Sequence, residues 1–199
     1  MNNPEYVQID DVKYKINTDF RVVLRFNELV LDNTISDYER GLGTILLFFG
    51  KEGINVPEHY ERLLKSTLNF VKGRPSSVHV DEKKKIVRDM DYKQDWGLIL
   101  ASMKQVYGID LTKEKLHWWT FFDYLNGLPT DCVLNQVREI RRKDLSKIKD
   151  RDEREEYIKL KEQWRLEEKD KPLSKEQQES VNRFYELTGI ERKWYYEWW

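Results

Sequence analysis

The sequence contains little cysteine, glycine or proline, and each scarcity excludes a class of protein. Its single cysteine, Cys132, leaves no partner for an intramolecular disulfide and too few thiols for a cysteine-rich metal site. The 9 glycines and 5 prolines among 199 residues disfavour a loop-rich all-β fold. The most apolar run, residues 43–50, is far shorter than the roughly 20 residues that span a bilayer.

Neither sign of charge prevails, because 35 Lys and Arg residues stand against 36 Asp and Glu residues. This balance removes the simplest electrostatic reason to expect a nucleic acid or an anionic membrane as partner. Residues 1–11 have neither the basic start nor the apolar run of a signal peptide. We therefore expect a soluble intracellular protein that does not associate with membranes.

Aromatic residues are plentiful at 13% of the chain, and they supply the buried area that disordered segments lack. Apolar residues recur mostly at helical spacing, so the expected fold class is mainly α: a helical domain with a small N-terminal β-hairpin and a long charged C-terminal helix. We divide the chain into residues 1–73 (hairpin and three helices), a linker over 74–88, an aromatic-rich helical core over 89–143, and residues 144–199 (charged helix, short helix and aromatic C-terminal tail).

Local signals place the predicted elements. Two strands within residues 6–16 flank an Asp-Asp turn. Glycines or capping residues bound most of the expected helices. The first helix is expected to begin at Asn17 or Thr18, the second to run from a Ser36/Glu39 capping box to Gly50, and the third from Pro57 to Gly73. The next three are expected from around Tyr92 to Gly108, from a Thr112 cap to Asn126, and after Pro129. One charged helix is expected over 141–171, and a last helix from a Ser174/Gln177 capping box to Gly189.

No catalytic motif or metal-ligand pattern is found, so we expect no enzyme activity, no metal and no cofactor. Cys132 has the chemistry of a nucleophile, but we interpret it as a core thiol before a helix. Asp91 and Asp95, one helical turn apart, have the spacing to share a cation. We interpret them, with Asp89, as solvated carboxylates that complement the helix dipole.

Clustered aromatic residues are the candidate protein-interaction sites. Large side chains at 118–122 surround more than half of a helix, which predicts either a fully covered helix or one with a face for a partner. A thin apolar seam marks the charged helix, and an aromatic cluster ends the chain. The candidates are Trp118, Trp119, Phe121, Phe122, Trp164, Trp194, Tyr195, Tyr196, Trp198 and Trp199. The basic stretch 138–149 is interleaved with acids, so we interpret it as a salt-bridged face rather than a phosphate site.

Three motifs in order resemble a phage protein family. They are Tyr107-Gly108-Ile109-Asp110-Leu111, Leu116-His117-Trp118-Trp119 and Gly127-Leu128-Pro129, preceded by Asp89-x-Asp91-Tyr92 and followed by Val137-Arg138-Glu139-Ile140-Arg141. The chain thereby resembles proteins of tailed siphophages and prophages of Gram-positive bacteria that are encoded between the tail tube and tape measure proteins. The similarity extends from about residue 6 to residue 190.

That resemblance implies a tail assembly chaperone, which is a non-enzymatic protein that self-associates and keeps the tape measure protein soluble before the tail tube polymerises. Its expected partners are the tape measure protein, other copies of itself and a second tail chaperone. Its expected location is the host bacterial cytoplasm and not the mature virion. The family provides no catalytic residues. The alternatives are a virion component, such as a tail completion or connector subunit, and, less favoured, a nucleic-acid-binding protein acting through residues 138–149.

Overall fold

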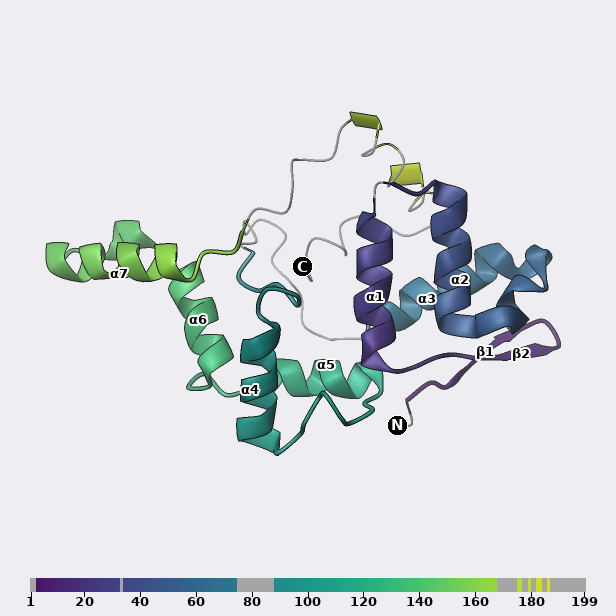
Figure 1. Cartoon of the computed structure of the whole chain (residues 1–199), viewed down its shortest axis with the longest axis horizontal. Coiled ribbons are helices and arrows are strands. Elements are labelled where there is room, and N and C mark those ends of the chain that lie inside the picture. Colours follow the sequence, from purple (N-terminus) through teal and green to yellow (C-terminus); the bar gives the residue numbers. More distant parts are fainter. Residues whose placement is uncertain are drawn as a thin grey trace. The chain divides into compact units, whose positions relative to one another are not determined.

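A computed structural model describes residues 3–32, 34–74 and 88–167, and six single positions between 175 and 186. Within these residues the chain is mainly α-helical with one antiparallel β-hairpin, as predicted (Figure 1). The elements are β1 Tyr6–Ile9, β2 Val12–Lys15, α1 Phe20–Leu31, α2 Asp37–Ile54, η1 Pro57–His59, α3 Tyr60–Val71, α4 Trp96–Tyr107, α5 Trp118–Asn126, α6 Val133–Arg142, η2 Leu145–Lys147 and α7 Arg151–Gln163, η1 and η2 being short 3₁₀ helices.

The described chain forms two compact units. The first unit contains the hairpin, α1, α2, α3 and residues 115–123, and the second contains residues 88–114 and 124–167. Most of the expected linker, the short helix after Ser174 and the aromatic C-terminal tail fall outside the described residues or are described at only a few positions. Among the described helices, none has both the length and the apolar character needed to cross a membrane.

The N-terminal hairpin has the predicted two-residue turn. Ile9 pairs with Val12, so Asp10 and Asp11 form the turn, and Asp10 adopts a left-handed conformation with φ of 51°. Aspartate tolerates this region better than most residues because its short side chain can hydrogen-bond locally. The Tyr14 side chain is buried, and its hydroxyl lies 2.8 Å from Nδ1 of His59. Tyr14 is therefore one anchor of the hairpin, and Ile9, which is also buried, is another.

An ion pair joins the hairpin turn to α3. Nη1 of Arg62 donates a hydrogen bond of 2.7 Å to Oδ1 of Asp10, and this bond lowers the pKa of the Asp10 carboxyl below its ordinary value of 3.8. A lowered folded-state pKa stabilises the fold above the unfolded-state pKa, and the contribution is lost as the pH falls through the lowered value.

We therefore predict that Arg62→Ala unfolds at a lower urea concentration than the wild type at pH 7. The difference should shrink as the pH falls below about 4, because protonated Asp10 no longer attracts Arg62. Urea denaturation followed by circular dichroism at several pH values measures this. Lys65→Ala removes an exposed cation from the same helix and is the control. If the difference in unfolding urea concentration between Arg62→Ala and the wild type stays constant down to pH 2, the prediction is wrong.

Side-chain caps mark the starts of α1 and α2. Asp19, rather than Asn17 or Thr18, caps α1, because its carboxylate accepts a hydrogen bond from the backbone N–H of Arg21. The capping box of Ser36 and Glu39 is confirmed at the start of α2. Gly50, with φ of 63°, interrupts α2 where the helix was expected to end, but helical structure resumes and continues to Ile54.

The core of the first unit is aromatic. Phe20 stacks on Phe121 with ring centroids 4.5 Å apart, and Phe26 meets Phe48 edge-on at 5.7 Å. Two backbone hydrogen bonds hold residues 115–123 against the start of α1: Phe20 N–H donates to Leu116 O, and Trp118 N–H donates to Thr18 O. Thus a segment about 100 positions later in the sequence completes the first unit.

The start of α5 differs from the prediction. Thr112 does not cap this helix; its backbone N–H donates to Oδ1 of Asp110 within a separate turn. The helix begins at Trp118 instead, where Nδ1 of His117 accepts a hydrogen bond of 3.1 Å from the backbone N–H of Trp119. The end of α5 at Asn126 is as predicted.

The charged segment is a shorter helix than expected. The predicted single helix over 141–171 is wrong, since α6 ends at Arg142 and α7 spans only Arg151–Gln163. Two aspartates break the segment. Asp144 accepts a hydrogen bond from Ser146 N–H, and Asp150 accepts one from Glu153 N–H as the N-cap of α7. Aspartate side chains compete with helical hydrogen bonds in this way and favour turns and caps.

Candidate protein-binding surface

Two of the candidate aromatic residues on α5 belong to the core. Trp118 is 3% exposed and Phe121 is fully buried. The Trp118 indole N–H also donates a hydrogen bond of 2.9 Å to Val71 O, which satisfies its only polar atom. For these two positions the structure agrees with the covered-helix alternative, so we assign them to the stability of the first unit.

Trp119 and Phe122, the other two candidates on α5, are half-buried. The Trp119 ring stacks on Phe70, and its indole N–H donates to Phe70 O at 2.8 Å. The Arg74 guanidinium lies 5.5 Å from the centroid of the Trp119 ring and forms an ion pair with Asp123. The Trp119 ring is therefore fixed in orientation, and both residues remain partly accessible to solvent.

The remaining described candidate, Trp164, follows α7 and is also half-buried. Its backbone oxygen accepts a hydrogen bond of 2.6 Å from Nε of Arg141, and Nζ of Lys161 donates to the carbonyls of Arg141 and Lys143. The α7 segment thus lies against the C-terminal end of α6. The candidates Trp194, Tyr195, Tyr196, Trp198 and Trp199 lie outside the described residues.

The three aspartates before α4 are not the solvated carboxylates that the sequence suggested. Asp91 and Asp95 are buried, and Asp95 is 2% exposed. The Asp95 carboxylate receives two hydrogen bonds from Arg141, of 2.7 and 2.8 Å, in a bidentate pair. Arg141 also donates to Asp89 O at 2.9 Å. Helix periodicity gave no sign of this pairing because the two residues lie 46 positions apart.

The same ion-pair network uses other cations of the basic stretch 138–149. Asp89 lies 3.3 Å from Arg138 and 3.1 Å from Arg142. Lys147 forms a separate, exposed pair with Asp144 at 3.8 Å. The predicted salt-bridged face is therefore present, but several of its partners come from the segment before α4 rather than from the stretch itself. These arginines hold the second unit together.

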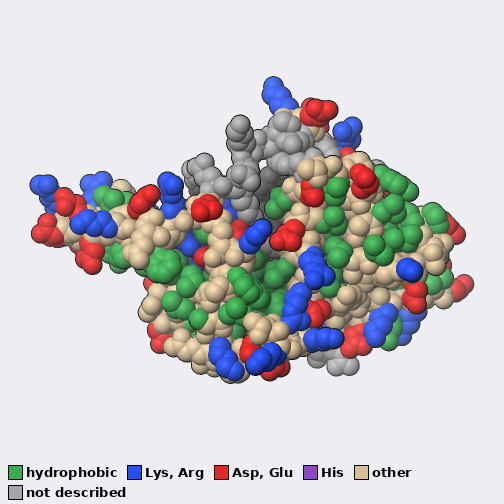
Figure 2. All heavy atoms as spheres, viewed as in Figure 1, with side chains coloured by type: hydrophobic (Ala, Val, Ile, Leu, Met, Phe, Trp, Pro, Cys, Tyr) green, Lys and Arg blue, Asp and Glu red, His purple; other side chains and the backbone are tan. Residues whose placement is uncertain are grey.

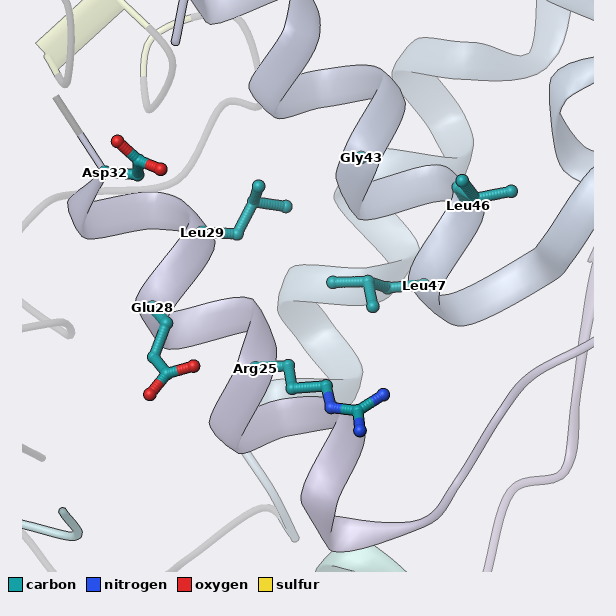
Figure 3. A pocket seen from close by; sticks show the side chains of 7 residues that line it. All are labelled: Arg25, Glu28, Leu29, Asp32, Gly43, Leu46 and Leu47. Atoms are coloured by element: carbon teal, nitrogen blue, oxygen red, sulfur yellow. The ribbon is translucent and has the colours of Figure 1, made fainter. Parts of the chain in front are cut away.

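A groove between α1 and α2 in the first unit has a volume of about 430 Å³ (Figure 3). Gly43 allows the Leu29 side chain to approach α2 closely, since a Cβ atom at this position would lie only 3.0 Å from Cδ2 of Leu29. Figure 3 shows the Leu29 side chain pointing toward α2, whereas Glu28 points away from it. The lining residues are Arg25, Glu28, Leu29, Asp32, Gly43, Leu46 and Leu47.

An apolar stripe on α2 borders the groove. Tyr38, Leu42 and Leu46 recur every four residues, so they share one helix face. Tyr38 is 71% exposed and Leu46 is 50% exposed. Figure 2 shows hydrophobic side chains gathered over this part of the first unit. We call the groove and the stripe together the α1–α2 surface; its residues are Arg25, Glu28, Leu29, Asp32, Tyr38, Leu42, Gly43, Leu46 and Leu47.

The sequence contained a signal for this surface. Residues 45–49 are all apolar, and five consecutive side chains surround more than one face of a helix. Ile45, Phe48 and Phe49 are buried in the structure, so Leu46 is left toward solvent. As at residues 118–122, consecutive large apolar side chains cannot all face the core, and here the exposed apolar face lies on α2.

The comparison with protein families identifies what kind of protein carries these surfaces. A family model described as "Bacteriophage Gp15 protein" matches residues 1–166. The chain belongs to this bacteriophage family. Neither the curated proteins nor the solved structures contain a match. The matched range of the Gp15 family member covers the whole α1–α2 surface and the ion-pair network, and the predicted resemblance to a phage protein family is confirmed.

In residues 3–32, 34–74 and 88–167, and the few positions described after them, no group of three or more His, Cys, Asp or Glu side chains is placed to hold a metal ion. Cys132 is a buried thiol at the N-cap of α6, as predicted. The features of this Gp15 family member that suit binding are apolar and aromatic surfaces.

Proposed function

We propose that this protein is a non-enzymatic tail assembly chaperone that self-associates and keeps the tape measure protein soluble before the tail tube polymerises. Membership in the bacteriophage Gp15 family points to a phage structural or morphogenesis protein. The more specific role rests on the resemblance carried by residues 107–129 and on the surface chemistry. The proposed location is the host bacterial cytoplasm, and a second tail chaperone is a further proposed partner.

The observation that carries the proposal is the exposure of large apolar side chains on a very highly charged chain. Tyr38 and Leu46 are each half exposed or more, while 36% of the residues are charged. Charged residues of both signs keep such a protein in solution, and exposed apolar patches mark sites for other polypeptides. An amphipathic helix of the tape measure protein is the type of ligand that apolar and aromatic surfaces accept.

The half-buried aromatic residues and the aromatic C-terminal end are the proposed contacts for the tape measure protein. Trp119, Phe122 and Trp164 are each partly exposed, and aromatic anchors contribute much of the binding energy at protein interfaces. The C-terminal candidates Trp194, Tyr195, Tyr196, Trp198 and Trp199 add five further large rings. None of these contacts requires a cofactor or a metal.

Co-expression with the tape measure protein of the same phage tests the proposal. We expect this chain to raise the soluble yield of the tape measure protein several-fold relative to an unrelated protein of similar size. Serine at the five aromatic positions after Lys193 should reduce that yield while the chain keeps its length. Ile158→Ser, which removes one exposed apolar side chain elsewhere, is the matched control. An unchanged yield with the wild-type chain contradicts the proposed function.

The composition of purified phage particles distinguishes a chaperone from a structural virion component. We expect mass spectrometry to detect almost none of this chain in mature particles, because a chaperone leaves when the tube closes around the tape measure protein. Peptides of this chain at a fixed copy number per particle would instead identify a tail completion or connector subunit.

A further inference from the structure

The α1–α2 surface combines apolar side chains with charges in a defined order. Arg25, Glu28 and Leu29 lie at positions i, i+3 and i+4 of α1, and Asp32 is the C-cap residue directly after the helix; all four line the groove. The cation lies toward the start of α1, and the carboxylates lie toward its end. The Asp32 carboxylate accepts hydrogen bonds from the N–H and hydroxyl of Thr34, and these bonds lower its pKa. It is therefore ionised at neutral pH.

This order of charges is complementary to itself across a two-fold axis. Arg25 and Asp32 lie seven positions apart in the sequence, one within α1 and one at its C-terminal end, with their midpoint between Glu28 and Leu29. When two copies of α1 lie antiparallel across this midpoint, Arg25 of each copy faces Asp32 of the other. A parallel arrangement would place like charges together. A two-fold interface forms every contact twice, so both ion pairs form at once.

The apolar residues fit the same arrangement. Leu29 of each copy lies beside the axis, and Leu46 and Leu47 of α2 flank it, so the exposed Leu46 and the half-buried Leu29 and Leu47 of both copies are covered together. Gly43 lets the Leu29 side chain lie directly against α2, so leucines of α1 and α2 form one continuous apolar lining. Covering Tyr38 and Leu46 removes exposed apolar area that a soluble monomer would otherwise present to water.

We propose that the α1–α2 surface is a two-fold interface with a second copy of this chain, in which Arg25 pairs with Asp32 of the second copy around a leucine centre. The inference gives a location to the self-association that is part of the proposed function, on which it rests. Glu28 of each copy comes close to the axis in this arrangement, so its charge opposes association and tunes the affinity of the pair.

Charge reversal tests the interface, because both sides of it are in one sequence. We expect wild-type protein to sediment as a dimer or as a multiple of dimers. Arg25→Asp and Asp32→Arg should each weaken association at least about tenfold, since each replaces two attractions by two repulsions. The double variant Arg25→Asp/Asp32→Arg restores both pairs with reversed sign and should return the dissociation constant to within about threefold of wild type.

Further variants separate the interface from general effects on solubility. Leu46→Asp should dissociate the pair, whereas Ile158→Asp makes the same chemical change at a side chain of similar exposure and should leave the mass unchanged. Glu28→Gln should tighten association. Circular dichroism of each variant checks that it is folded. Analytical ultracentrifugation over a range of concentrations gives the dissociation constants for all of them.

Three outcomes overturn the inference: a monomeric wild-type protein, association that Leu46→Asp leaves unchanged, or a double charge reversal that fails to restore what the single reversals lose. These outcomes are separable from the proposed function. A monomer that still keeps the tape measure protein soluble overturns the interface alone. A two-fold dimer that fails to solubilise the tape measure protein overturns the chaperone role and leaves the interface standing.

Discussion

Asp95→Ala is expected to lower the free energy of unfolding by about 3–5 kcal/mol, because it leaves the buried guanidinium of Arg141 without its carboxylate partner. Asp95 is 2% exposed and receives two hydrogen bonds from Arg141, so solvent cannot readily replace the lost carboxylate. Urea denaturation of wild type and variant, followed by circular dichroism, measures the difference. A loss below about 1 kcal/mol would mean that water reaches the guanidinium.

A control and a double variant test the role of burial. Arg142→Ala removes a half-exposed partner of Asp89 and should cost less than about 1 kcal/mol. Asp95→Leu combined with Arg141→Met replaces both charges by apolar side chains and should recover part of the loss. We expect the recovery to be incomplete, because Arg141 also donates hydrogen bonds to the backbone carbonyls of Asp89 and Trp164. In the double variant these two carbonyls lose that hydrogen-bond donor.

Phe121→Ala should destabilise the first unit by about 3–5 kcal/mol through lost burial and the cavity left behind. The Phe121 ring is fully buried and stacks on Phe20 at 4.5 Å. Phe122→Ala makes the same change at the next, half-buried residue and should cost clearly less. Urea denaturation curves of the two variants measure the difference. Equal losses would contradict the assignment of Phe121 to the core and Phe122 to the surface.

Local sequence signals predicted much of the fold. The hairpin, the capping box at Ser36 and the end of α4 at Gly108 each depend on residues within a few positions of one another. Such short-range chemistry is visible in one sequence, because a cap or a turn selects particular residue types. Before α1, several neighbouring residues can act as a cap, and the observed cap, Asp19, lies one or two residues after the predicted Thr18 or Asn17.

Long-range pairing could not be predicted in the same way. From the sequence alone, Asp95 is interpreted as solvated and Arg141 as part of a salt-bridged face with neighbouring acids, since nothing in their local sequence indicates that they meet. The division of exposure on α5 was equally hidden: Trp118 and Phe121 became core, and Trp119 and Phe122 remained half-exposed, because residues 115–123 pack into the first unit. The exposed stripe on α2 depends on which faces α1 and α3 cover. The ion pair and the exposure of these side chains are all determined by packing between segments that are distant in the sequence.

The contribution of residues 115–123 to the first unit has a consequence for biosynthesis. Phe20 and Thr18, near the amino terminus, meet their partners Phe121, Leu116 and Trp118 only after more than half of the chain has been translated. On the ribosome, the nascent hairpin and first three helices therefore carry an unfilled aromatic site until α5 emerges. Truncated products that stop before α5 should be captured by host folding factors or degraded.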